Sequence, residues 1–245
     1  QIITVRDELR EFDALSRAQK QQGETETSEL APLRMEAIVV DTLVGKMLIR
    51  QLARAYDVKS DPIQVEKLYA QIVAEKGDEQ AFESELQETF GWTPEEFRSR
   101  VVVPFVLSSL LNDKLVNDET SQETRRQAIT IARTRLTSGE TMSDVARDLS
   151  LTYEVNATSD LGFLSASELP DAWKSPAFEL DIGGVSEILE SPEGFAVIQI
   201  LDRVTNEEET RAHIVAIRIP RKGFSDLFDE AKAQAKIWKF VGREG

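Results

Sequence analysis

The sequence predicts an α+β protein with a helical first half and a mixed second half. Apolar residues recur at helical spacing through most of residues 1–118, most strongly over 30–56. Near the C-terminus, two segments of alternating apolar residues, 194–204 and 210–219, are separated by a short polar loop, which predicts an antiparallel hairpin. An amphipathic segment over 224–241 predicts a final helix, with a strand as the alternative at its end.

The first helices are bounded by residues that favour helix ends. A helix, or a strand leading into one, is expected over 3–20. The apolar run 30–56 is expected to be the central helix, with a polar loop before it. Asp61 can cap a third helix with Pro62 at its first position. Gly77 is the expected end of that helix, because glycine readily takes the conformation that stops one.

The segment 92–115 opens with a capping box. Thr93 is the cap residue, Pro94 occupies the first helical position, and Glu96 can reach back to the cap. Pro104 lies inside this segment. Because proline has no N–H and its ring clashes with the preceding turn, we expect Pro104 to kink or split the helix.

The second half alternates short helices with strands. One helix is expected to end at Gly139 and another to begin at Thr141, which has Asp144 in capping spacing. A short strand over 160–165 and a short helix over 168–180 then precede the hairpin. This order of elements predicts a helix-rich α+β domain.

Composition excludes several classes of function. The protein has 245 residues and a net charge of −15, whereas a nucleic-acid binder needs a basic surface. It has no cysteine and a single histidine, which excludes thiol catalysis, Cys-ligated metals and multi-His zinc sites. We expect no metal and no cofactor. The apolar runs are shorter than the roughly 20 residues that span a bilayer, so membrane contact is expected only through an N-terminal signal or anchor removed before Gln1.

One stretch carries motifs of a known family. The pieces are Asp160-Leu161-Gly162-Phe163, Phe178-Glu179-Leu180, Gly184-Val185-Ser186 and Gly194-Phe195. In this order they resemble the second half of a parvulin-type (rotamase) peptidyl-prolyl isomerase domain, which is a small four-stranded antiparallel sheet flanked by helices. The family's first strand, H-I-L-V, is missing before the helices, but 211–219 resembles it. The resemblance therefore implies a circularly permuted parvulin-like domain.

The helical first half is similar in pattern to the N-terminal domain of SurA-, PrsA- and PpiD-like folding factors. In that family a C-terminal helix returns to complete the helical domain. The resemblance implies a chaperone domain over 1–118, a parvulin-like domain over 119–222, and a C-terminal helix in 223–245 that packs back on the first domain.

The resemblance also assigns site residues. Leu169, Trp173 and Phe178 fall at the apolar positions that grip the substrate proline. For such a trio, ordinary core packing is an equally good interpretation.

The polar positions of the family are only partly kept. His213 falls at the first-strand histidine, Thr152 at the cysteine or aspartate position and Ser191 at a loop hydroxyl, but the partner histidine is replaced by Ala196. Without that partner, a structural strand histidine is the better interpretation of His213, and locally bonded hydroxyls are the better interpretation of Thr152 and Ser191. The site is therefore expected to be degenerate.

Three functions stay open at this point. The first is an extracytoplasmic chaperone that holds unfolded or proline-containing polypeptides, with a parvulin-like domain of weak or no isomerase activity. The second is an active peptidyl-prolyl isomerase, and the third is a non-catalytic interaction scaffold. None of the three involves nucleic acid.

Overall fold

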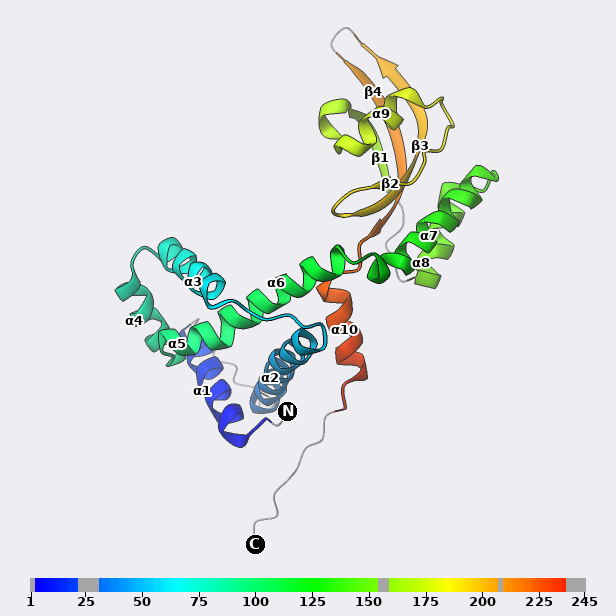
Figure 1. The fold of residues 1–245 in the computed structure, drawn as a ribbon. Helices are drawn as coiled ribbons and strands as arrows, with labels where there is room; N and C mark the ends of the chain where they lie inside the picture. The colour runs from blue at the N-terminus through cyan, green and yellow to red at the C-terminus, as the bar shows by residue number, and fades with distance from the viewer. Residues whose placement is uncertain (1–2, 22–30, 154–158, 207–208, 237–245) are drawn as a thin grey trace. The chain divides into compact units, whose positions relative to one another are not determined.

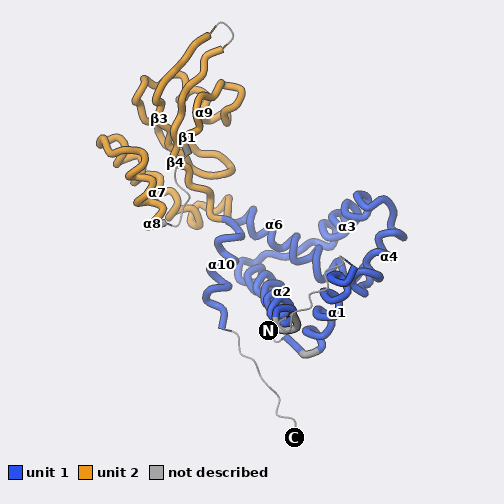
Figure 2. The backbone as a smooth tube through the Cα atoms, turned by 180° about the vertical axis from the view of Figure 1, so that it is seen from behind, with its two compact units in different colours: residues 1–114, 223–245 blue, residues 115–222 orange. Residues whose placement is uncertain are grey.

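The protein folds into helices and one small sheet. The computed structural model describes residues 3–21, 31–153, 159–206 and 209–236. It divides into two compact units, Gln1–Lys114 with Gly223–Gly245 and Leu115–Lys222 (Figure 2). Each unit is described by itself below.

The first unit is entirely helical in its described part. Its helices are α1 (Val5–Gln21), α2 (Ala31–Ala55), α3 (Pro62–Lys76), α4 (Glu79–Phe90), α5 (Pro94–Phe97), the π-helical turn η1 (Arg98–Val102), α6 (Val103–Val116, whose last two residues belong to the second unit) and α10 (Phe224–Gln234) (Figure 1). Helix α1 packs against α2 and α4, and α10 packs against α2. Phe224 of α10 contacts a buried cluster that contains Ala53, Leu107 and Leu111. The part of our expected final helix after Lys236 lies outside the described residues.

The helix ends follow the local signals. Asp61 accepts a hydrogen bond from the Ile63 N–H, with Pro62 at the first position. The capping box at Thr93 and Glu96 is present in both directions. These caps satisfy N–H groups that have no partner within the helix.

Pro104 widens a turn instead of splitting the helix. The Val103 N–H bonds to the Arg98 carbonyl, five residues back, and the backbone runs from α5 through η1 into α6 without interruption. Because Pro104 cannot donate to the carbonyl four residues before it, the backbone inserts a π-turn and continues. The helix is therefore not split at Pro104 but continues through this change of hydrogen-bond register.

The second unit carries the sheet. Helices α7 (Glu119–Thr137) and α8 (Met142–Tyr153) precede β1 (Ser159–Ser165), the 3₁₀ turn η2 (Ala166–Glu168), α9 (Asp171–Glu179), β2 (Leu189–Glu190), β3 (Gly194–Thr205) and β4 (Thr210–Pro220). The strand order is β1-β4-β3-β2 and every pairing is antiparallel. The predicted α+β class with a four-stranded antiparallel sheet is confirmed.

Each face of the sheet is covered by different helices (Figure 1). Phe195, Val197, Ile217 and Ile219 form one buried cluster with α7 and α8, whereas Ala196, Ile198, Ile214 and Ala216 form another with α9. Alternate residues of a strand point to opposite faces, so β3 and β4 are apolar on both sides. This is the pattern expected for the two central strands.

Candidate functional site

The apolar trio lies together beneath α9. Leu169 and Trp173 are each 6% exposed and belong to the cluster that also holds Ala196, and Phe178 packs against it partly buried. The structure therefore brings the three residues together. Leu169 and Trp173 are almost completely covered by neighbouring atoms, as core side chains are.

His213 lies far from Ala196. It is opposite Asp202 of β3, whereas Ala196 is opposite Arg218, five residues further along β4. At about 3.3 Å per residue this separates the two positions by roughly 16 Å along the strand. Strand alternation also places His213 on the face of Val215 and Ile217, away from Ala196.

The His213 ring is held by β1. Its Nε2 is 2.8 Å from Asp160 Oδ1, and its ring centroid is 4.9 Å from that of Phe163. The hydrogen bond from the Gly162 N–H is the largest cause that lowers the pKa of the Asp160 carboxyl, and the hydrogen bond with His213 lowers it further. Both favour the ionised form of Asp160, which accepts these hydrogen bonds. This arrangement fits a structural strand histidine.

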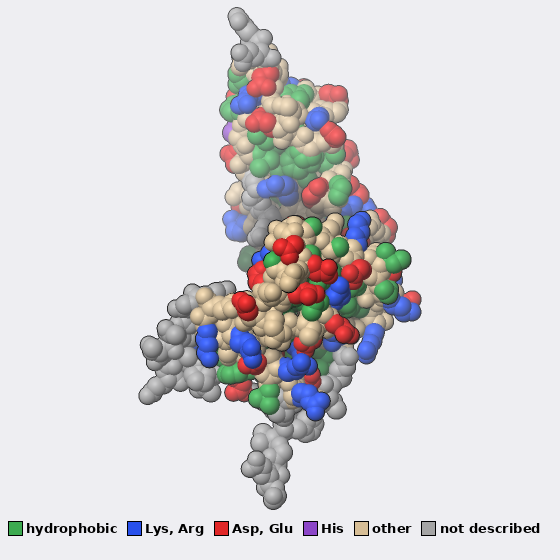
Figure 3. Space-filling model, turned by 90° about the vertical axis from the view of Figure 1, so that its left-hand side faces the viewer, with side chains coloured by type: hydrophobic (Ala, Val, Ile, Leu, Met, Phe, Trp, Pro, Cys, Tyr) green, Lys and Arg blue, Asp and Glu red, His purple; other side chains and the backbone are tan. Residues whose placement is uncertain are grey.

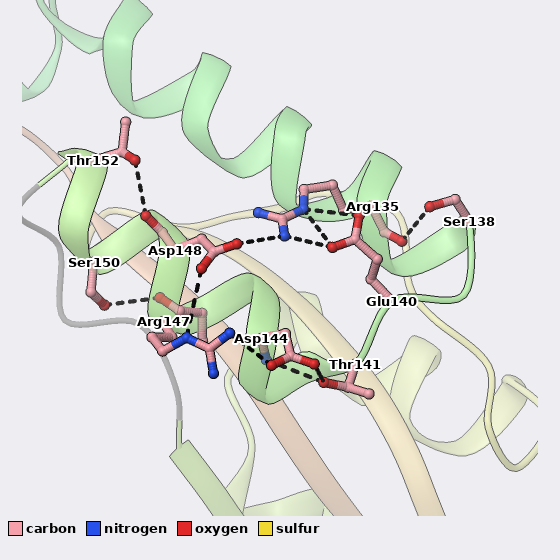
Figure 4. A network of polar contacts seen from close by, with 10 residues as sticks. Arg135, Ser138, Glu140, Thr141, Asp144, Arg147, Asp148, Ser150 and Thr152 are labelled. Carbon is pink, nitrogen blue, oxygen red and sulfur yellow. Dashed lines mark hydrogen bonds and ion pairs between the residues drawn. The ribbon is translucent and has the colours of Figure 1, made fainter.

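The two hydroxyls make local hydrogen bonds. Thr152 is exposed on α8, on the opposite side of the sheet from α9, and donates to the Asp148 carbonyl (Figure 4). Ser191 belongs to a tight turn with Gly194, and its Oγ accepts from the Glu193 N–H at 3.2 Å. In the described part of the protein, no hydrogen bond joins Thr152, Ser191 and His213 to one another.

The residues around Thr152 form a network of ion pairs between α7 and α8. Arg135 of α7 binds both Glu140 and Asp148, and Arg147 binds Asp144, which also accepts from Thr141 (Figure 4). The hydrogen bond from Arg135 is the largest cause that lowers the pKa of Glu140. These ion pairs fix the turn between α7 and α8.

Two hollows were not predicted from the sequence. In the helical unit, a groove of about 390 Å³ between α3 and α6 is lined by Gln64, Lys67, Leu68, Gln71, Phe105, Val106, Ser109, Leu110 and Asp113. In the second unit, a hollow of about 610 Å³ is lined by Ala166, Ser167, Phe178, Arg203, Thr205, Glu209 and Thr210. Each hollow is lined by residues from separate segments of the sequence, so no local motif predicts it.

Within the described ranges, no three His, Asp or Glu side chains are grouped closely enough to hold a metal ion. In the same part of the protein, no helix is long and apolar enough to cross a membrane.

The fold and the motifs define a parvulin-type domain in this protein. Residues 109–202 match the family model of the PPIC-type PPIase (rotamase) domain, and the matched segment ends before β4. Beyond this segment, the sequence is similar over most of its length to a PrsA protein and over part of its length to a SurA protein.

Two relatives support this assignment. The sequence is 25% identical to the foldase protein PrsA of Halalkalibacterium halodurans, over 88% of this chain and 73% of that protein. It is 28% identical to the chaperone SurA of Aromatoleum aromaticum, over 43% of this chain and 25% of that protein.

Proposed function

We propose that the protein is an extracytoplasmic chaperone that holds unfolded polypeptides, and that its parvulin-like domain has weak or no isomerase activity. The observation that carries the second half is the burial of Leu169 and Trp173, two of the three apolar positions, together with the distance of His213 from Ala196. Isomerisation must lower a barrier of about 18–20 kcal/mol by gripping the proline and positioning hydrogen bonds around the twisted amide. The trio and the dispersed hydroxyls offer neither.

The domain assignment is part of this proposal. We take 1–118 with the returning C-terminal helix as the chaperone domain and 119–222 as the parvulin-like domain. The position of β4 between β1 and β3 supports a circular permutation in which 211–219 replaces the family's first strand.

The groove between α3 and α6 supports client binding by the helical unit. Phe105 on its wall is 62% exposed, and Leu68 and Leu110 add further apolar surface to the lining. Apolar side chains exposed at a hollow favour contact with apolar segments of other proteins.

The surface charge also fits polypeptide clients better than nucleic acid. The protein has 44 acidic and 29 basic side chains, and Figure 3 shows both kinds interspersed on the face it presents. Interspersed charge keeps a protein soluble without forming the basic stripe that phosphate backbones require.

We expect isomerase activity on a proline tetrapeptide to be at least about tenfold below that of an ordinary parvulin, a deficit of about 1.4 kcal/mol in transition-state stabilisation. Ala196→His is expected to leave the rate at background, because residue 196 is 4% exposed within the core and lies away from His213. A protease-coupled isomerase assay measures both. A rate within tenfold of an ordinary parvulin, or a gain in Ala196→His, contradicts the proposed loss of activity.

Phe105→Ser is expected to raise the amount of protein needed to suppress aggregation of a denatured client by about tenfold. Burying a phenylalanine contributes about 1.5–3 kcal/mol, and about 1.4 kcal/mol corresponds to a factor of ten. Light scattering of the client is the measurement. Leu151→Ser is the matched control, because Leu151 is 80% exposed on α8, outside the groove. Equal loss in both variants would count against the groove, and no suppression by the unaltered protein would remove the chaperone proposal.

A further inference from the structure

The hollow beside Phe178 is built largely by the hairpin that joins β3 and β4. Arg203 and Thr205 come from the end of β3, and Glu209 and Thr210 from the start of β4. These four residues follow the segment 109–202 that matches the rotamase family model. The hollow is therefore formed in good part by residues outside the matched domain.

Arg203 is a fixed cation in this hollow. Its Nη2 donates to the Ala177 carbonyl at 3.1 Å and to the Leu180 carbonyl at 2.7 Å, at the end of α9. No carboxylate within the described ranges forms an ion pair with it, and its Nε has no hydrogen-bond partner there. Two carbonyls hold the guanidinium in place without neutralising its charge.

The negative charge of Glu209, the acidic residue in the lining, is balanced by a neighbouring arginine. Glu209 Oε1 accepts from Arg211 Nε at 2.6 Å, and Arg211 also reaches Glu168 at 3.2 Å. Glu209 therefore opposes an incoming anion less than a free carboxylate would. Among the lining residues that the structure describes, Arg203 is the charged group without a counter-charge.

The rest of the lining has both apolar and polar character. Phe178 and Ala166 supply apolar surface, while the Thr205 and Thr210 hydroxyls bond to each other at 3.0 Å across the two strands. A guanidinium forms strong, charge-assisted hydrogen bonds with a carboxylate. An aromatic side chain gains further free energy by covering another apolar group.

We propose that this hollow binds a polypeptide segment that presents a carboxylate beside an apolar side chain, with the carboxylate on Arg203 and the apolar group on Phe178. The proposal rests on the proposed function only in that the ligand is a client polypeptide. The carboxylate can come from the C-terminus of the client or from an acidic side chain within it.

The test is a titration of the protein with three probes, in which the NMR shifts of the Thr205 and Thr210 amides report binding. The probes are acetylated Ala-Phe-Ala with a free carboxylate, the same peptide as its amide, and acetylated Ala-Phe-Glu-Ala amide. We expect at least one carboxylate probe to bind about tenfold more tightly than the amide. Tighter binding of the peptide with a free carboxylate indicates that the hollow recognises a C-terminus. Tighter binding of the glutamate peptide amide indicates that it recognises an acidic side chain. Equal binding of all three, or no binding, overturns the proposal.

Three variants make the test specific. Ala166→Trp fills the hollow from an exposed turn and is expected to abolish the shifts, whereas Ala172→Trp, at an exposed site on α9 outside the lining, is expected to leave them unchanged. Arg203→Gln is expected to bring the carboxylate probes down to the level of the amide. If the Ala166→Trp variant folds and still binds the probes as tightly as the unaltered protein, the proposal is contradicted. This holds even if the Arg203→Gln variant fails to fold.

Aggregation suppression separates this proposal from the proposed function. If the protein suppresses aggregation but ignores the probes, the hollow proposal alone fails. If it binds the probes without suppressing aggregation, the chaperone proposal alone fails.

Discussion

Glu11→Gln is expected to lower the free energy of unfolding of the helical unit by about 3–5 kcal/mol, because it leaves two partly buried cations without their shared counter-charge. The Glu11 side chain is only 2% exposed. Its two oxygens lie 2.7 Å from Lys46 Nζ and 2.8 Å from Arg100 Nη1, so one carboxylate joins α1, α2 and η1. Trp92 lies beside both cations, which limits the water that can replace the carboxylate.

Amide hydrogen exchange in α1 and α2 measures this loss without interference from the other unit. Asp13→Asn is the matched control on the same helix, since Asp13 is 61% exposed and pairs with Arg17 within a single helix. An exposed pair contributes about 0.2–1 kcal/mol, so the control is expected to change exchange very little. If the two variants behave alike, the buried ion pairs do not hold the three helices together.

Sequence signals predicted local structure where the cause is local. Asp61 with Pro62, and Thr93 with Glu96, form the caps that their spacing indicated, because a cap involves only a few neighbouring residues. The response of the backbone to Pro104 was not predictable in the same way. Whether a helix breaks or inserts a π-turn depends on the packing of the residues around it, and Val102 is completely buried.

For the candidate site too, the sequence predicted features with a local cause but not those that depend on packing. The motifs predicted the class of domain and the grouping of Leu169, Trp173 and Phe178, which share one short helix and its approach. They did not predict how deeply the first two are buried. The motif order suggested that His213 and Ala196 belong to one site, but strand register places them far apart.

The hollow beside Phe178 could not be predicted at all. It combines η2, the end of α9 and both strands of the hairpin, and its fixed cation depends on carbonyls at the end of α9. Glu11 is a similar case, because nothing in the sequence distinguishes it from the exposed acidic residues of the same helix. Burial of a charge is decided by tertiary packing, which a single sequence shows only indirectly.

Gly194→Ala is expected to destabilise the second unit by about 3 kcal/mol, through overpacking against backbone atoms. A Cβ at residue 194 would lie 2.3 Å from the Ile219 carbonyl oxygen and 2.8 Å from the Pro220 Cα. Neither atom can move aside easily, because the next pair in the ladder joins Phe195 to Ile219, and both side chains are almost completely buried.

The expected damage is centred where β3 begins, so the measurement is hydrogen exchange in β3 and β4 together with thermal unfolding. Gly45→Ala in α2 is the control: its Cβ would meet only Phe228 Cζ at 3.5 Å, an ordinary contact. Because alanine favours a helix over glycine, that variant is expected to be neutral or more stable by up to about 1 kcal/mol. Tolerance of Gly194→Ala would mean that β3 and β4 can separate at this end, and that the two central strands are less firmly joined than their register implies.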